Sequence, residues 1–119
     1  MAWKFASDRP VYIQIADKIK QFILSGEYAP DTQIPTVRQI ALEAAVNPNT
    51  VQRAFSELEN EGLIIVRGTL GRFVTEDTEK INYCRHEYAI QTVKDFVYDM
   101  KKLSIPDNEI SDMLEEVLR

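Results

Sequence analysis

Apolar residues recur every three to four positions in the N-terminal half of the chain, which is the period of an amphipathic helix. The first such stretch covers residues 10–25 and is followed by Gly26, a typical helix stop. The second covers residues 37–44, and at its start Thr36 and Gln39 have the spacing of a capping box. The pattern predicts two helices joined by a turn.

A third helix is predicted to begin at Pro48, because Asn47 is a strong capping residue and proline suits the first helical position. The helix ends before Gly62. One face carries an apolar stripe at helical spacing, which we expect to lie in the core. The opposite face is polar and consists of Asn49, Gln52, Arg53 and Ser56.

The helical period is lost after Gly62. Residues 63–66 and 73–75 are short runs of apolar and β-branched residues, and residues 67–72 between them contain two glycines, so we predict a β-hairpin, or wing. Residues 76–80 are polar without an apolar period and are expected to form a link.

Two further amphipathic stretches follow within residues 81–119, separated by a break at residues 104–107. One long and one short helix cannot bury both apolar stripes alone, because each stripe needs a partner surface. The simplest surface that could cover both stripes is the tail of a second copy of the chain. The alternative is that this tail folds back on its own N-terminal domain. The expected dimer contacts are Phe96, Met100, Leu103, Ile110, Met113, Leu114 and Val117.

These elements together predict a mainly α fold class with a small β-hairpin. Residues 1–75 are expected to form a winged helix-turn-helix, and residues 81–119 a two-helix C-terminal dimerisation tail. In a winged helix-turn-helix the third helix enters the major groove of DNA. The order of these elements therefore makes the polar face of the third helix the predicted DNA-binding surface.

Side chains on that face have the chemistry to recognise bases. The amides of Asn49 and Gln52 can bond adenine edges in two-pronged fashion, and Arg53 can reach guanine or a phosphate. The alternative for all three is a solvated helix face. Arginines at the start of the second helix and on the wing are expected to reach phosphates, and those of the wing also an adjacent minor groove. They are Arg38, Arg67 and Arg72.

The charge distribution bears on this hypothesis, because binding to DNA neutralises phosphates with basic side chains. The net charge is −5. Residues 1–75 hold eight basic and eight acidic side chains, whereas residues 76–119 hold six basic and eleven acidic ones. The excess acidity thus lies in the tail and leaves the N-terminal domain compatible with DNA. A winged helix that binds another protein, and no DNA, is the alternative interpretation.

The sequence does not predict an enzyme, a cofactor or a metal site. Cys84 and His86 point to different faces of a helix, and no second Cys-His group completes a tetrahedral shell. Neither a glycine-rich phosphate loop nor a Ser/His/Asp set is present. The longest apolar run, residues 62–66, is far too short for a membrane span. With one cysteine and no secretory signal, we expect a cytoplasmic protein.

Four runs of residues, in this order and spacing, resemble the GntR superfamily of bacterial transcription regulators over about residues 10–75. These runs are residues 10–16 (PVYIQIA), 34–41 (IPTVRQIA), 47–51 (NPNTV) and 58–64 (LENEGLI). The short tail and the PNTV opening of the third helix resemble the YtrA-type subfamily in particular. Members of that subfamily carry a winged helix and a two-helix dimerisation tail.

The resemblance implies a DNA role for Arg38, for Asn49, Thr50 and Gln52, and for Gly68 at the wing tip. A twofold dimer would present two third helices to half-sites of inverted-repeat, double-stranded operator DNA, and a repressor is the favoured role. The tail is too short to enclose an effector pocket within one subunit, so a small molecule could bind at the dimer interface. No effector is identified.

The sequence departs from the family pattern at three positions. Pro48 and Gln52 stand where relatives often have arginines, so base recognition is expected to differ from theirs. Asp31 stands where the family usually has glycine. Because aspartate tolerates left-handed backbone angles better than most residues, we expect the turn at this position to survive.

Overall fold

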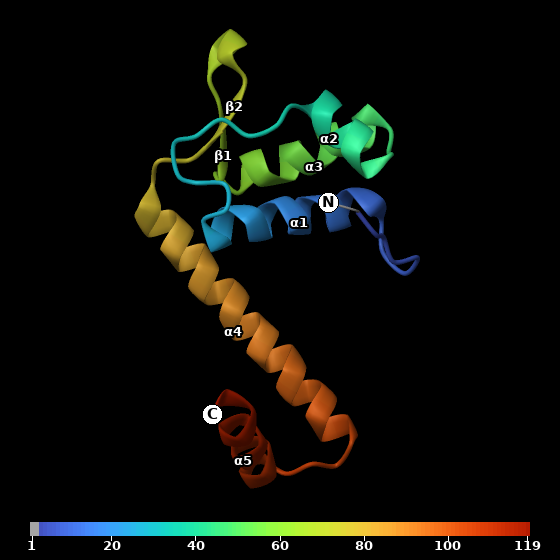
Figure 1. Cartoon of the computed structure of the whole chain (residues 1–119), viewed down its shortest axis with the longest axis vertical. Coiled ribbons are helices and arrows are strands. Elements are labelled where there is room, and N and C mark those ends of the chain that lie inside the picture. The colour runs from blue at the N-terminus through green and yellow to red at the C-terminus, as the bar shows by residue number, and fades with distance from the viewer. Residues whose placement is uncertain (1–2) are drawn as a thin grey trace. The chain divides into compact units, whose positions relative to one another are not determined.

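The computed structural model describes residues 3–119, which form two compact units, one ending at Cys84 and one beginning at Arg85. Three helices and a hairpin are followed by two C-terminal helices, and Figure 1 shows their order along the chain. The predicted mainly α fold class, with a winged helix-turn-helix and two further helices, is confirmed. The elements are α1 (Val11–Ser25), α2 (Val37–Ala44), α3 (Pro48–Asn60), β1 (Ile64–Val66), a 3-10 turn (Gly68–Leu70), β2 (Arg72–Val74), α4 (Thr78–Lys102) and α5 (Asp107–Leu118).

Local sequence signals account for the starts of α2 and α3. At α2 the Thr36 hydroxyl accepts a hydrogen bond from the Gln39 backbone N–H at 3.1 Å, and the Gln39 side-chain oxygen accepts one from the Thr36 N–H at 2.8 Å. The predicted capping box is therefore confirmed. At α3 the Asn47 side chain accepts a hydrogen bond from the Asn49 N–H at 2.8 Å, and Pro48 occupies the first turn.

Burial divides α1 and α3 into an inward and an outward face. The inward side chains recur at helical spacing and are at most 1% exposed: Ile15, Ile19, Ile23, Val51, Ala54, Phe55 and Leu58. Burying one large apolar side chain stabilises the fold by about 1.5–3 kcal/mol. Packing of α1 against α3 through these residues fixes the rotation of α3 about its axis. The polar face of α3 is consequently turned outward.

The wing is a short antiparallel hairpin in which Ile64 pairs with Val74, Ile65 with Phe73 and Val66 with Arg72. Its strands start and end within one residue of the predicted runs. The structure adds a feature that the sequence pattern did not predict, since Gln33 forms a β-bridge with Phe73. The loop before α2 thus runs alongside β2 and is joined to it by backbone hydrogen bonds, and Figure 1 shows this loop crossing the hairpin.

The fourth helix begins earlier than predicted. Helix α4 starts at Thr78, so residues 78–80 of the expected link 76–80 are helical, and this boundary was wrong. Asp77 explains the early start, because its carboxylate accepts a hydrogen bond from the Lys80 N–H at 3.0 Å and so caps the helix. None of the helices within residues 3–119 has the length and apolar character needed to cross a membrane.

Candidate nucleic-acid interface

The polar face of α3 is the centre of the candidate interface. Asn49, Gln52 and Arg53 are exposed, whereas Thr50 is half-buried. They lie in the N-terminal half of α3, where the positive end of the helix dipole favours a polyanion. The structure thus brings together the four predicted residues of the third helix on its outward side.

Arg53 is held by an aromatic ring. Its guanidinium carbon lies 3.8 Å from the centroid of the Tyr12 ring, which belongs to the first turn of α1. Such a cation–π contact is worth about 0.5–1 kcal/mol at an exposed site. Tyr12, Asn49, Thr50 and Arg53 line a shallow depression of about 330 Å³. The stacking restricts where Arg53 can reach, a constraint that helical spacing could not predict because Tyr12 is distant in sequence.

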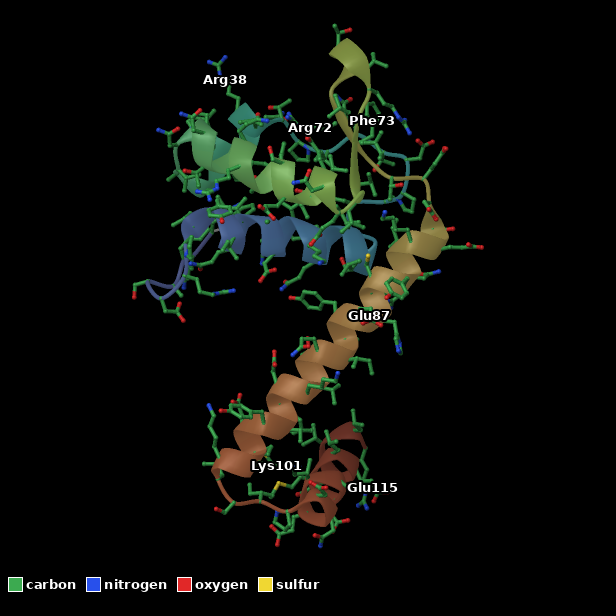
Figure 2. All side chains as sticks on the ribbon, turned by 180° about the vertical axis from the view of Figure 1, so that it is seen from behind. Arg38, Arg72, Phe73, Glu87, Lys101 and Glu115 are labelled. Carbon is green, nitrogen blue, oxygen red and sulfur yellow. The ribbon has the colours of Figure 1, made fainter. Side chains whose placement is uncertain are left out.

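Arg38 is the freest of the predicted basic residues. It lies in the first turn of α2 and is exposed, and within residues 3–119 it forms no ion pair. Figure 2 shows its side chain extending outward from the start of α2. Its charge is therefore available to a phosphate without breaking an internal contact.

A hollow of about 280 Å³ separates the start of α2 from α3 and the wing. Arg38, Gln52 and Arg72 line it together with Gln33 and Gly71. The hollow thus connects three of the predicted DNA-contacting residues, which come from three different elements. Polar side chains from helix and wing converge there without forming an enclosed ligand cavity.

Both predicted wing arginines have carboxylate partners. Arg72 Nε lies 2.6 Å from Glu59 Oε1 of α3, and the Arg72 guanidinium carbon lies 5.0 Å from the centroid of the Phe55 ring. Only 24% of the Arg72 side chain is exposed, and Figure 2 shows it between the wing and α3. Arg72 is thus fixed at the base of the wing, and its charge is partly neutralised before any ligand binds.

Arg67 is paired in a similar way at the top of β1. Its guanidinium donates to the carboxylate of Asp31 and lies 4.6 Å from the centroid of the Phe73 ring. Asp31 has φ 63, so the predicted left-handed turn is formed with aspartate in place of glycine. The same residue that departs from the family pattern therefore supplies the partner of a wing arginine. Sequence reasoning considered the backbone at this position and missed the ion pair.

Gly68 opens the exposed 3-10 turn at the wing tip, with φ 53. Thr69 and Leu70 complete this turn, and Leu70 is 68% exposed. The tip thus carries no basic side chain, and the nearest arginines are those already paired. Contact of this tip with DNA would depend on backbone groups and small side chains.

Cys84 and His86, the residues considered for a metal site, lie outside this surface. Cys84 is half-buried and His86 is exposed. Within residues 3–119 no three His, Cys, Asp or Glu side chains are placed to hold a metal ion.

Comparison with known proteins agrees with a regulatory role. The family model for "Bacterial regulatory proteins, gntR family" matches residues 11–74. The uncharacterized HTH-type transcriptional regulator YhcF of Bacillus subtilis (strain 168) is 35% identical over 107 residues, which are 90% of this chain and 88% of that protein. The HTH-type transcriptional repressor YtrA of the same strain is 37% identical over 73 residues, 61% of this chain and 56% of that protein. These relatives are transcriptional regulators and not enzymes, and the predicted resemblance to GntR regulators of the YtrA type is confirmed.

Solved structures show the same fold. A GntR family transcriptional regulator from Listeria monocytogenes superposes with a TM-score of 0.87 at 32% identity, covering 94% of this chain and 98% of that chain. The structure of AraR(DBD) in complex with operator ORX1 superposes with a TM-score of 0.58 at 25% identity, covering 63% of this chain and 95% of that chain. A similar domain is thus seen bound to operator DNA.

Proposed function

Since the chain belongs to the GntR family of bacterial regulatory proteins and is a DNA-binding transcription regulator, we propose that it is a repressor that binds an inverted-repeat operator as a homodimer. The observation that carries this proposal is the outward polar face of α3 next to the unpaired Arg38. A helix presented in this way fits the major groove of B-DNA.

In the proposed complex, the residues of α3 divide their roles by chemistry. The amides of Asn49 and Gln52 bond base edges, since each can donate and accept in one plane, as adenine requires. Thr50, half-buried beside them, contacts the backbone or a thymine methyl group. Arg53 contacts guanine or a phosphate from its stacked position on Tyr12.

Arg38 and the wing supply the backbone contacts in this proposal. Arg38 carries a free charge to a phosphate, and Gly68 offers backbone N–H groups at the wing tip. Arg67 and Arg72 contribute less to DNA binding than two unpaired arginines would, because each already forms an ion pair, with Asp31 and Glu59 respectively. The salt dependence of binding should therefore be shallow for a protein with four arginines near the interface.

The homodimer is proposed from the apolar residues of the tail. Ile110 is buried and Phe96 and Met100 are half-buried within the C-terminal unit. The remaining expected contacts keep large exposed fractions: Leu103 70%, Met113 40%, Leu114 38% and Val117 78%. Burying these side chains against a second copy would remove apolar surface from water. The twofold symmetry would place two α3 helices on half-sites about one helical turn apart.

Repression in this proposal is steric, with the bound dimer covering a promoter that overlaps the operator, in the cytoplasm. In this proposal a small-molecule effector could bind at the dimer interface. A gel shift with DNA from upstream of the gene's own operon, against a random duplex of equal length, tests the proposal. We expect a salt-sensitive, sequence-specific shift below micromolar protein. A folded protein that shifts neither duplex at low salt would contradict it and favour the protein-interaction alternative.

A further inference from the structure

The loop before α2 is joined to the wing by backbone hydrogen bonds on both sides of Gln33. The Asp31 N–H donates to the Val74 carbonyl at 3.1 Å, and the Ile34 N–H donates to the Arg72 carbonyl at 3.0 Å. Ile34 is itself buried, with 4% exposed. The base of the wing is consequently fixed to the segment that leads directly into α2.

The Gln33 side chain extends this connection toward the wing tip. Its amide Nε2 donates a hydrogen bond to the Leu70 carbonyl at 2.7 Å. Leu70 is the last residue of the tip turn, and that turn is closed by the Leu70 N–H bonding the Arg67 carbonyl at 3.0 Å. The Gln33 amide therefore ties the tip to the loop before α2.

Gly71 leaves space for this contact. Its φ is 111, and a Cβ at this position would lie 2.9 Å from Gln33 Nε2. A side chain at position 71 would therefore be strained and would also push the amide away from Leu70. The hydrogen bond from Gln33 to Leu70 thus requires a glycine at position 71. The sequence pattern predicted a turn at Gly71 but gave no role to Gln33.

Gln33 is exposed and contributes nothing to the apolar core. It also lines the hollow between α2, α3 and the wing, beside Arg38 and Gln52. A side chain in this place is suited to setting the distance between the wing tip and the helices that face DNA.

We infer that Gln33 is a positioning residue for DNA recognition, which holds the tip Gly68–Leu70 where it meets the duplex while α3 occupies the groove. This inference rests on the proposed function, because the position of the tip affects binding only if the wing contacts DNA. It assigns Gln33 an effect on affinity through the wing and no direct contact with a base. Loss of the hydrogen bond should free the tip and leave base preference in the groove unchanged.

The test compares Gln33→Met, which keeps the length of the side chain and removes the donor, with Gln91→Met as a matched control. Gln91 Nε2 donates to Asp95 on the exposed surface of α4, so the control loses a comparable hydrogen bond away from the wing. Limited trypsin digestion with mass spectrometry measures cleavage after Arg67, and a titration with the operator measures affinity.

For Gln33→Met we expect cleavage after Arg67 to accelerate about three- to tenfold and operator affinity to fall about three- to tenfold, the range for one lost hydrogen bond. The melting temperature should fall by less than about 5 °C, and the bases preferred by α3 should not change. Gln91→Met should alter neither cleavage nor affinity.

Unchanged cleavage after Arg67 would overturn the inference, and so would faster cleavage with unchanged operator affinity. A change in base preference would also overturn the inference, because it would mean that Gln33 itself contacts a base. If the unmodified protein bound no duplex, the proposed function would fail separately, and the cleavage assay would still decide whether Gln33 holds the tip.

Discussion

The pairing of Asp31 with Arg67 leads to the prediction that removing an acidic side chain, Asp31→Asn, strengthens binding to DNA of any sequence. The carboxylate and the guanidinium are 53% and 34% exposed, so their ion pair stabilises the fold by less than about 1 kcal/mol. Asparagine also tolerates the φ of 63 at this position. The variant should therefore fold normally and carry a free Arg67 on each wing.

The expected gain follows from counterion release. Each additional phosphate contact steepens the dependence of log affinity on log salt concentration by about 0.9. The proposed homodimer gains one contact per subunit, which makes the slope steeper by roughly 1.8. At 50 mM salt the variant should bind more tightly than the unmodified protein. Between 50 and 200 mM salt its affinity should then fall by a factor about ten times larger than that of the unmodified protein.

Fluorescence anisotropy with a random duplex over that salt range measures this slope. Asp17→Asn is the matched control, because Asp17 lies in α1 and pairs with Arg9 at 3.4 Å with 43% of its side chain exposed. Both substitutions change the net charge equally, but only Asp31→Asn frees an arginine of the wing. Equal slopes for the two variants would refute the reasoning, as would a shallower slope for Asp31→Asn, which would mean that the carboxylate orients Arg67 toward DNA.

Three further outcomes are expected. Arg38→Ala should weaken binding to operator and random DNA alike and make the salt slope shallower by about 0.9 per subunit, and a loss confined to the operator would contradict a phosphate contact. Phe55→Ala, at a side chain that is 0% exposed, should lower the free energy of unfolding by about 3–5 kcal/mol in a urea titration, whereas a loss below about 1 kcal/mol would place Phe55 outside the core. Val117→Glu should shift the protein from dimer to monomer in sedimentation velocity while Asn108→Glu on the same helix does not, and two dimeric variants would count against the proposed tail interface.

Features that depend on neighbouring residues could be predicted from the sequence. The predicted second helix, residues 37–44, has the bounds that the structure shows, because the capping box of Thr36 and Gln39 acts within one turn. The outward face of α3 was likewise predictable, since helical spacing alone separates Val51 from Gln52.

Features that join distant parts of the chain were not predictable in this way. The partner of Arg72 is 13 residues away on another element, and the amide of Gln33 meets a carbonyl 37 residues away. No periodic pattern encodes such pairs, because one depends on how β2 lies against α3 and the other on how the loop before α2 lies against the hairpin. The sequence therefore predicted a DNA role for the wing arginines without revealing that each is already paired.

The most direct test of the account is selection of binding sites from random duplexes, carried out in parallel with the unmodified protein and Gln52→Ala at one salt concentration. The account predicts that the unmodified protein enriches an inverted repeat. It also predicts that Gln52→Ala loses preference at one base step in each half-site, with affinity for random DNA unchanged. Enrichment of no sequence, or identical preferences for the two proteins, would contradict the claim that the polar face of α3 reads DNA.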